Sequence, residues 1–304
     1  MIADRPLPGM ALMIGFCVLA PLGDSLAKIL GDSVPLGHLL LVRFALQAAI
    51  LVPLALATRI SLRLTPRVLR LTVLRTLLHI VGIAAMFASL RFLPLADAIA
   101  IAFVMPFLML LLGRFVLGEQ VGPYRLMACV VGFVGTLLVI RPNYAEVGTP
   151  ALLPLVVAVA FSLFMLVTRH VAKAADPIAL QAVSGLLATP ILAAALLVGW
   201  NLDIPDLRIV ATTSTETLLL VAVGVLGTLA HLLMTWSLRL APAATLAPMQ
   251  YLEIPFATVI GWMIFRDLPD AMASAGIALT VGAGLYVIHR EQIAARRARA
   301  AESA

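Results

Sequence analysis

The sequence predicts an all-α integral membrane protein with ten transmembrane helices, and three observations lead to this fold class. Of its 304 residues, 62% are hydrophobic and 12% are charged, against roughly 45–50% and about 25% in an ordinary soluble domain. The apolar residues form a series of stretches about 20 residues long, which is the length of a helix that crosses a bilayer. The second half of the chain also repeats the pattern of the first.

The apolar stretches define the expected spans, which are joined by short connections. We expect them at residues 9–29, 36–57, 69–90, 94–117, 123–140, 150–170, 177–199, 216–239, 242–265 and 270–288. The first stretch contains Asp24 and Lys28 and is followed at once by further spans, so we interpret it as a retained helix rather than a signal peptide. Cys17 and Cys129 both fall inside spans and define no disulfide framework.

The positive charge is concentrated in two segments. The formal net charge is +6, which in a soluble protein would suggest nucleic-acid binding. One segment connects the second and third spans, and the other is the tail after the last span; they contain Arg59, Arg63, Arg67 and Arg70, and Arg290, Arg296, Arg297 and Arg299. Because Lys and Arg collect in cytoplasmic connections, we expect an inner-membrane, multi-pass protein with both termini cytoplasmic, a basic cytoplasmic tail at 291–304 and no nucleic-acid partner.

An internal repeat relates the two halves of the chain. Ser89–Pro94 recurs as Ser237–Pro242, a shift of 148 residues, and Pro106-Phe107 recurs as Pro255-Phe256 with one extra residue. Each copy holds five expected spans, an odd number, so the second copy enters the membrane from the opposite side. We therefore predict two inverted five-helix repeats, residues 1–142 and 143–290. Carriers built in this way place the substrate near the midplane between the repeats.

Small residues in the fifth and tenth spans match at the same shift. Ala128, Gly132 and Thr136 correspond to Gly276, Thr280 and Gly284. Small residues four positions apart let helix backbones approach closely. We expect a tight packing seam on both helices, although such residues are also frequent in membrane helices that carry no seam.

The residues of the repeat resemble a known family. Arg91–Ala100, Pro106-Phe107, Gly118-Glu119 and Gly132–Gly135 resemble the first half of an EamA-type carrier of the drug/metabolite transporter superfamily, and Gln250–Phe256 with Gly261-Trp262 and Asp267 resembles the second half. The resemblance covers nearly the whole chain. It implies a secondary transporter whose central cavity is lined mainly by the first, third, fourth, sixth, eighth and ninth spans.

The same resemblance leaves the substrate open among several classes. The family contains exporters of amino acids and related metabolites, importers of riboflavin and S-adenosylmethionine, and flippases for lipid-linked sugars. Asp24–Lys28 followed by Arg43 is most similar to the riboflavin and S-adenosylmethionine branch. The resemblance therefore favours uptake of a cofactor-like compound, with export and lipid-linked sugar flipping as the alternatives.

Charged residues inside the first two spans are candidate site residues, because ionisable groups at helix centres usually face a cavity or a partner. Asp24 and Lys28 are one turn apart. Either they neutralise each other, or Lys28 reaches the external surface, or Lys28 lies at the cavity mouth and attracts an anionic group. Arg43 lies inside the second span and is expected to pair with a carboxylate or with the substrate.

Two histidines in corresponding helices form a second candidate group. His79 and Arg75 share a face of the third span, and His231 lies one turn beyond the residue that matches His79 in the eighth. We predict that the two imidazoles approach each other at the cavity, where they either carry a coupling proton or pack as neutral hydrogen-bonded groups. Arg75 is assigned to a headgroup or loop contact. Trp236 either stacks on a planar ring or belongs to an interfacial belt.

The ninth span contains the remaining candidate site residues. Gln250, Tyr251 and Glu253 precede Pro255, which interrupts the helix as Pro106 does in the fourth span. Interrupted helices at matching points of two halves indicate a binding site. Glu253 is interpreted either as the carrier of a coupling proton or as the carboxylate that fastens the arginine of the second span.

Other polar residues near span ends are given structural roles. Asp97 lies in the first turn of a helix, where the helix dipole favours a carboxylate. Arg91 and Arg239 end their helices and are assigned to dipole and headgroup contacts.

An enzyme and a channel are the main rival classes. The sequence has no H-E-x-x-H, G-x-S-x-G or P-loop motif, and an enzyme would leave the repeat without a purpose. We therefore predict no catalytic residues, cofactor or metal. The expected partners are a small-molecule substrate, the lipid bilayer, a coupling proton and, as an open possibility, a second copy of the chain in a homodimer.

Overall fold

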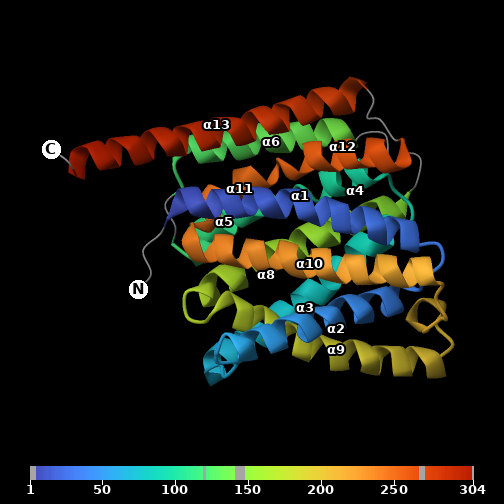
Figure 1. The fold of residues 1–304 in the computed structure, drawn as a ribbon. Helices are drawn as coiled ribbons and strands as arrows, with labels where there is room; N and C mark the ends of the chain where they lie inside the picture. Colours follow the sequence, from blue (N-terminus) through green and yellow to red (C-terminus); the bar gives the residue numbers. More distant parts are fainter. Residues whose placement is uncertain (1–4, 119–120, 141–147, 267–270, 303–304) are drawn as a thin grey trace.

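A computed structural model describes residues 5–118, 121–140, 148–266 and 271–302. Every regular element within these ranges is helical. The helices run side by side in one bundle, and the start of α1 (Pro6–Leu30) and the end of α13 (Ala271–Glu302) lie at the same end of it (Figure 1).

The other elements follow the expected spans closely. They are α2 (Leu36–Ala57), α3 (Pro66–Ser89), α4 (Leu95–Ala102), α5 (Met105–Val116), α6 (Pro123–Ile140), η1 (Thr149–Leu152), α8 (Leu153–Ala172), α9 (Pro177–Asn201), η2 (Pro205–Leu207), α10 (Ser214–Leu240), α11 (Ala243–Gln250) and α12 (Glu253–Phe265). The largest difference is at the C-terminus, where α13 continues through the expected tail. Because no helix-breaking residue follows position 288, α13 extends beyond the neighbouring helices (Figure 1).

Local sequence explains where several helices begin. The hydroxyl of Thr65 accepts a hydrogen bond from Val68 N at the start of α3, and a carboxylate oxygen of Asp176 accepts one from Ile178 N at the start of α9. Thr213 and Glu216 form a reciprocal capping box at the start of α10. Each of these side chains satisfies backbone N–H groups that have no partner within the helix.

Two of the expected spans are each divided into two helices. The fourth is interrupted at Phe103–Val104, just before Pro106, and the ninth at Tyr251–Leu252, just before Pro255. Proline lacks an N–H and its ring collides with the preceding turn. The predicted interruptions at corresponding points of the two halves are therefore confirmed.

The helices pack in pairs that join the first half of the chain to the second. α1 packs along α10 and α3 along α8, while α2 packs on α9 and α6 on α13. The pair α6–α13 is very close, since a Cβ added to Gly135 would lie 2.6 Å from the carbonyl oxygen of Gly276. The fifth and tenth spans therefore pack closely on each other. Gly276 belongs to the predicted set of small residues, whereas its partner Gly135 does not, and Gly132 of that set packs against the ring of Tyr251 instead.

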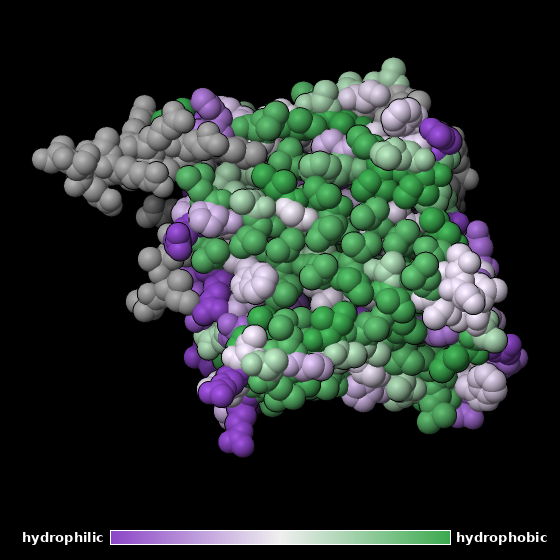
Figure 2. Space-filling view, viewed as in Figure 1, coloured by the Kyte–Doolittle hydropathy of each residue, from purple (hydrophilic) through white to green (hydrophobic). Residues whose placement is uncertain are grey.

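The face seen in Figure 2 is divided into an apolar middle and two polar ends. Seven helical stretches are long and apolar enough to cross a membrane, and shorter apolar helices lie at 123–135, 253–265 and 274–286 among the described residues. Hydrophobic residues cover the middle of the visible face, and hydrophilic residues gather toward its two ends (Figure 2). This distribution is that of a multi-pass membrane protein, because lipid tails offer no partner for polar groups.

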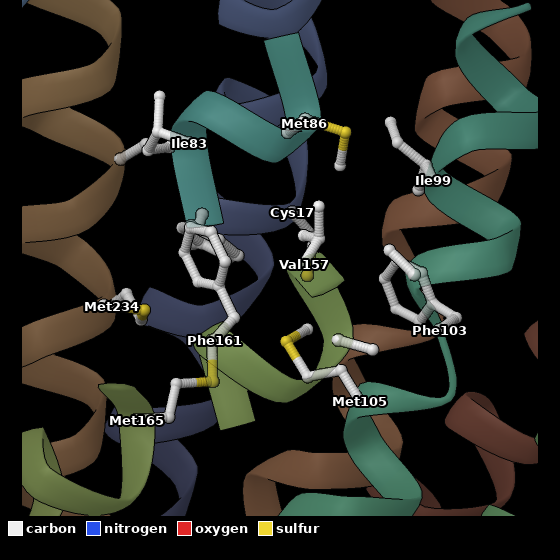
Figure 3. Close-up of a cluster of buried hydrophobic side chains, with 14 of the residues drawn as sticks. Cys17, Ile83, Met86, Ile99, Phe103, Met105, Val157, Phe161, Met165 and Met234 are labelled. Atoms are coloured by element: carbon white, nitrogen blue, oxygen red, sulfur yellow. The ribbon is translucent and has the colours of Figure 1, made fainter. Parts of the chain in front are cut away.

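The interior contains many methionines. Met86, Met105, Met165 and Met234 lie with Phe161 and neighbouring apolar side chains between the helices (Figure 3). Methionine is flexible and fills irregular gaps. This part of the core surrounds the cavity described next.

Candidate functional site

A cavity lies among seven helical segments, and the atom-free space in it, counted together with the solvent at its mouth, is about 630 Å³. Its walls come from α1, α2, α3, the α4–α5 break, α8, α10 and the start of α12. These are the helices that the family resemblance implied, with α2 in addition. The lining residues include Phe16, Asp24, Arg43, Met86, Phe87, Phe103, Met105, Phe161, Gly227, His231 and Glu253.

Arg43 is the most deeply buried cation on the cavity wall. Its side chain is 2% exposed. Nη2 lies 3.3 Å from Nε2 of His79 and 3.0 Å from Nδ1 of His231, and the guanidinium lies over the ring of Phe44 at 4.6 Å. Nη1 has no hydrogen-bond partner within the part of the chain that the structure describes. Arg43 therefore retains donors for a further group.

The two imidazoles lie together, as the sequence predicts. Their ring centroids are 4.3 Å apart, and His79 also stacks on Phe164 at 4.5 Å. A guanidinium has no acceptor, so both contacts with Arg43 require an unprotonated ring nitrogen. Nδ1 of His231 faces both Nη2 of Arg43 at 3.0 Å and Gly227 O at 2.9 Å, and in the neutral ring it either accepts from the guanidinium or donates to the carbonyl oxygen. The arrangement therefore favours two neutral imidazoles.

His231 and His79 differ in their access to the cavity. His231 lines it, and its Nε2 has no partner among the described residues. His79 is fully buried behind Arg43 and does not line the cavity. His79 is therefore separated from the cavity by side chains that it contacts, which are those of Arg43, His231 and Phe161.

Asp24 and Glu253 bring two carboxylates to the cavity wall. Glu253 is the first residue of α12, directly after the helix break, and is 6% exposed. Within the described ranges neither carboxylate lies within 4.0 Å of the guanidinium nitrogens of Arg43. The hydrogen-bond partners of Arg43 are the two imidazoles instead. The expectation that Glu253 fastens Arg43 is therefore wrong.

Lys28 lies above Asp24 on α1 but pairs elsewhere. Its Nζ donates to the carbonyl oxygen of Leu93 at 2.7 Å and lies 5.2 Å from the centroid of the Phe265 ring. Lys28 is outside the cavity lining. The expected mutual neutralisation of Asp24 and Lys28 is not present among the described contacts. The long side chain of Lys28 reaches the carbonyl oxygen of Leu93 instead.

Three other predicted site residues do not line the cavity. Nε2 of Gln250 lies 3.4 Å from Met109 Sδ and 3.3 Å from Met165 Sδ. The hydroxyl of Tyr251 donates to Cys129 O at 3.2 Å. Trp236 packs against the cluster of Leu51, Ala182 and Leu232 between α2, α9 and α10. The rotation of α10 and of the α11–α12 break turns these side chains into helix contacts.

Arg75 is not a headgroup or loop contact. Its side chain is fully buried and donates to hydroxyls of Thr168, Ser184 and Thr235 at 2.7, 2.6 and 3.3 Å. These residues belong to α8, α9 and α10. Arg75 lies near the start of α3, which suggested a contact with headgroups or a loop. Neighbouring helices cover the face of α3 that carries it, so its side chain does not reach either.

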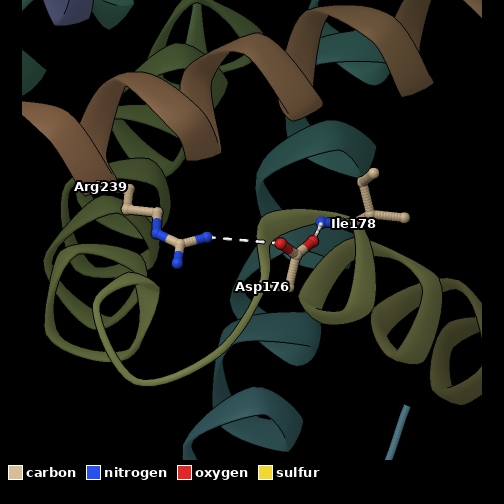
Figure 4. A network of polar contacts seen from close by, with 3 residues as sticks. All are labelled: Asp176, Ile178 and Arg239. Carbon is tan, nitrogen blue, oxygen red and sulfur yellow. Dashed lines mark hydrogen bonds and ion pairs between the residues drawn. The ribbon is translucent and has the colours of Figure 1, made fainter. Parts of the chain in front are cut away.

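The arginines at the ends of α3 and α10 also have other partners than expected. Arg91 Nη1 lies 2.6 Å from a carboxylate oxygen of Asp206. Arg239 Nη1 lies 3.5 Å from a carboxylate oxygen of Asp176, which also caps α9 (Figure 4). The first ion pair joins two connections, and the second joins the last turn of α10 to the start of α9. Neither arginine is therefore explained by dipole and headgroup contacts alone.

The sequence reasoning missed the aromatic lining and the hydroxyl partners of Arg75. Phe16, Phe87, Phe103 and Phe161 all face the cavity. A phenylalanine in a membrane helix gives no signal by itself, since aromatic residues face lipid as well. Serine and threonine are similarly inconspicuous because their hydroxyls can bond to the backbone of their own helix.

Comparison with known proteins agrees with the geometry. The chain matches the EamA-like transporter family over residues 7–141 and 149–289. It is 31% identical to a riboflavin transporter of Rhizobium johnstonii, over 71% of this chain and 69% of that protein. It is 22% identical to an S-adenosylmethionine uptake transporter of Rickettsia prowazekii, over 90% of each chain.

A solved crystal structure shares the fold. It has a TM-score of 0.72 and 21% sequence identity, and the match covers 92% of this chain and 95% of that one. The family model matches both halves of the sequence, so membership in this family accounts for the apolar bundle and its cavity. The protein belongs to the EamA-like transporter family of the drug/metabolite transporter superfamily and transports a small metabolite.

Proposed function

We propose that this protein is a secondary transporter that moves a small polar metabolite across the inner membrane by alternating access. The observation that carries the proposal is Arg43, a buried guanidinium on the cavity wall with one amino group unpartnered in the described structure. A desolvated cation held by two neutral acceptors has charge and donors left for a solute. Asp24 and Glu253 supply opposite charge on the same wall.

The proposed architecture is ten crossings in two inverted five-helix repeats. Under the shift of the repeat, α1 corresponds to α8 and α3 to α10, so the α1–α10 contact is the symmetry mate of the α3–α8 contact. The pairs α2–α9 and α6–α13 join corresponding helices directly. The position of both helical ends at one end of the bundle (Figure 1) agrees with an even number of crossings.

We assign the end that carries Arg59, Arg63 and Arg67 to the cytoplasm, following the bias of basic residues. Single cysteines at Ser61 and at Asn201 test this assignment with a membrane-impermeant thiol reagent. We expect Ser61→Cys to react only in inside-out vesicles and Asn201→Cys only from the outside. Reaction of both from the same side would contradict the inverted topology.

The proposed substrate is a cofactor-like compound with a planar ring, such as riboflavin or S-adenosylmethionine. Phe16, Phe87, Phe103 and Phe161 line the cavity and offer ring faces and edges for stacking. Relatives with these transport names are among the most similar proteins. A hydrogen-bonding ring system between Arg43 and the carboxylates would use both the apolar and the polar wall.

Counterflow in proteoliposomes tests transport and substrate together. Vesicles preloaded with unlabelled riboflavin or S-adenosylmethionine should accumulate the labelled compound faster than empty vesicles, because exchange through a carrier returns the site loaded. A channel would show no such acceleration. If neither compound exchanges and neither raises the melting temperature of the purified protein, the proposed substrate class is wrong.

Glu253 is our proposed carrier of the coupling proton. The imidazole nitrogens lie 3.3 and 3.0 Å from Nη2 of Arg43, so protonating either ring would place two cations together. Glu253 lines the cavity and has no hydrogen bond or ion pair within the described residues, which leaves its carboxylate available to a proton. Glu253→Gln should abolish uptake driven by a pH gradient while retaining counterflow. Loss of both activities with normal protein levels would assign Glu253 to substrate binding instead.

One chain supplies the whole cavity wall. Transport by this proposal therefore needs no second copy. A homodimer would join two complete carriers, and equal transport per chain in vesicles reconstituted with one or many copies would support this arrangement.

A further inference from the structure

Arg75 is a buried cation that the proposed transport site does not use. It lies on α3 one turn before His79 and is fully buried. Nε donates to Thr168 Oγ1 at 2.7 Å, Nη1 to Ser184 Oγ at 2.6 Å and Nη2 to Thr235 Oγ1 at 3.3 Å. Three helices of the second half of the chain thus hold one guanidinium of the first half.

The three hydroxyls form a neutral cage. Thr168 and Thr235 donate their own protons to the carbonyl oxygens of Phe164 and His231, both at 2.7 Å. Each hydroxyl oxygen can therefore accept from Arg75, and Thr235 Oγ1 also accepts from Gln181 Nε2 at 2.8 Å. No carboxylate lies within ion-pair distance of Arg75 in the described part of the chain. The charge of Arg75 is thus solvated by hydroxyl groups and is not neutralised.

Arg75 is connected to the cavity through one layer of rings. Its guanidinium lies 4.6 Å from the centroid of the Phe164 ring, and His79 stacks on the same ring at 4.5 Å. His79 in turn contacts Arg43 on the cavity wall. The cavity residues of α3 begin at Ile83, about 12 Å along the helix axis from Arg75 at 1.5 Å per residue. Arg75 therefore lies beyond the cavity floor, toward the end of the bundle at which α3 begins.

We propose that Arg75 is a second binding position for an anionic group of the transported solute, either a carboxylate or a phosphate. Of the two compounds named above, S-adenosylmethionine carries such a carboxylate, whereas riboflavin has no anionic group and would not use this position. This position becomes available when the end of the bundle at which α3 begins opens and α8, α9 and α10 separate from α3. The proposal rests on the proposed transport function and deepens it. Arg43 holds the solute in the cavity, and Arg75 receives its anionic group on the far side of the Phe164–His79 layer.

The composition of the cage supports this role over that of a static cross-link. A buried arginine is stabilised most strongly by a carboxylate, which binds it in a bidentate manner. A permanent ion pair would also exclude another anion. Hydroxyl groups give each guanidinium nitrogen of Arg75 one acceptor while leaving its charge uncompensated, so an incoming oxyanion can replace them.

Thiol labelling beside Arg75 tests the proposal without knowledge of the substrate. Thr168→Cys in a chain with Cys17→Ala and Cys129→Ala keeps Arg75 and places a thiol next to it. The probes are anionic sulfonatoethyl and cationic trimethylammonioethyl methanethiosulfonate, added in turn to each side of reconstituted vesicles. Each rate is divided by the rate of the same reagent with a free thiol in solution.

From the side at which α3 begins, we expect the anionic reagent to react about tenfold faster than the cationic one on this normalised scale, because a fixed charge in a cleft concentrates counter-ions. Arg75→Gln should abolish the preference, and Arg75→Lys should retain it. Ser184→Cys repeats the measurement from α9, so the result does not depend on the folding of one variant. Ser61→Cys, in an exposed segment, reports that the reagents reach that face.

Two results would overturn the proposal. If neither reagent reacts at Thr168→Cys or Ser184→Cys from either side while Ser61→Cys reacts, Arg75 is a static cross-link. If both reagents react equally and Arg75→Gln changes nothing, water reaches the position but Arg75 attracts no anion. A failure of the transport proposal would appear instead in the counterflow of the wild-type protein, which this labelling does not use.

Discussion

Arg43 and Arg75 carry the same charge inside the bundle but have opposite surroundings. Arg43 lines the cavity, contacts two imidazoles and keeps one amino group unpartnered in the described structure. Arg75 lies beyond the cavity, and each nitrogen of its guanidinium donates to a hydroxyl. Burial alone therefore does not distinguish the two residues. The number and chemistry of their partners distinguish them. Only Arg43, which has an unpartnered amino group in the described structure, can receive a solute without a rearrangement of helices.

The largest effect is expected from removing the charge of Arg43. Arg43→Gln should lower the initial rate of uptake about 100-fold, corresponding to about 3 kcal/mol of lost charged hydrogen bonding. The measurement is labelled uptake into proteoliposomes at equal protein content. Arg63→Gln, which removes an exposed arginine, is the matched control and should have no effect. Uptake above half of the wild-type rate in Arg43→Gln would remove this residue from the site.

A smaller effect is expected from replacing the histidines that hold Arg43. Nε2 of His79 and Nδ1 of His231 face Nη2 of Arg43. The amide oxygen of Gln can take the place of the first nitrogen, and that of Asn can take the place of the second. His79→Gln and His231→Asn should retain uptake within about threefold, whereas leucine at either position should lower it about tenfold through loss of one hydrogen bond. If both amide variants lose gradient-driven uptake but keep counterflow, the histidines carry the coupling proton.

A substitution at Gly227 tests how precisely the guanidinium of Arg43 must be positioned. A Cβ at this residue would lie 3.0 Å from Nε and 3.2 Å from Nη2 of Arg43. Gly227→Ala should therefore displace the guanidinium by a few tenths of an ångström and raise the KM for uptake about fivefold, as expected for a small misplacement of a binding group. Gly261→Ala is the control, because a Cβ there would meet no atom within 4 Å and the residue does not line the cavity. Equal KM values for the two variants would show that Arg43 adapts freely.

The smallest effect is expected in the cage of Arg75. Thr168→Val removes one acceptor from a charged donor and should lower the free energy of unfolding by about 1–2 kcal/mol, while uptake stays within about twofold because two hydroxyls remain. Denaturant unfolding in detergent, followed by tryptophan fluorescence, measures the change. Thr189→Val is the control, since that hydroxyl donates only to Gly185 O within its own helix. A tenfold loss of uptake in Thr168→Val would show that the cage takes part in transport as a unit.

The sequence predicted the elements of the fold because their causes are local. Apolar stretches of bilayer length specify helices. Pro106 and Pro255 interrupt two of them regardless of which helices pack against them. The repeat further predicted that His79 and His231 approach each other, and their rings lie 4.3 Å apart. Residue type inside a span was also enough to single out Arg43, Asp24 and Glu253, all of which line the cavity.

The sequence did not decide which face of each helix meets which neighbour. Gln250, Tyr251 and Trp236 have suitable side chains, yet they contact Met109, Cys129 and the α2–α9 cluster instead of the cavity. Arg75 lies near the beginning of its helix, yet hydroxyls from three other helices surround it. Span length, hydropathy and proline position affect the backbone only within a few residues along the chain. The sequence alone therefore determined the helices and their interruptions. Only the tertiary structure decided which polar groups face the cavity, because rotation of each helix is set by contacts between residues far apart in the chain.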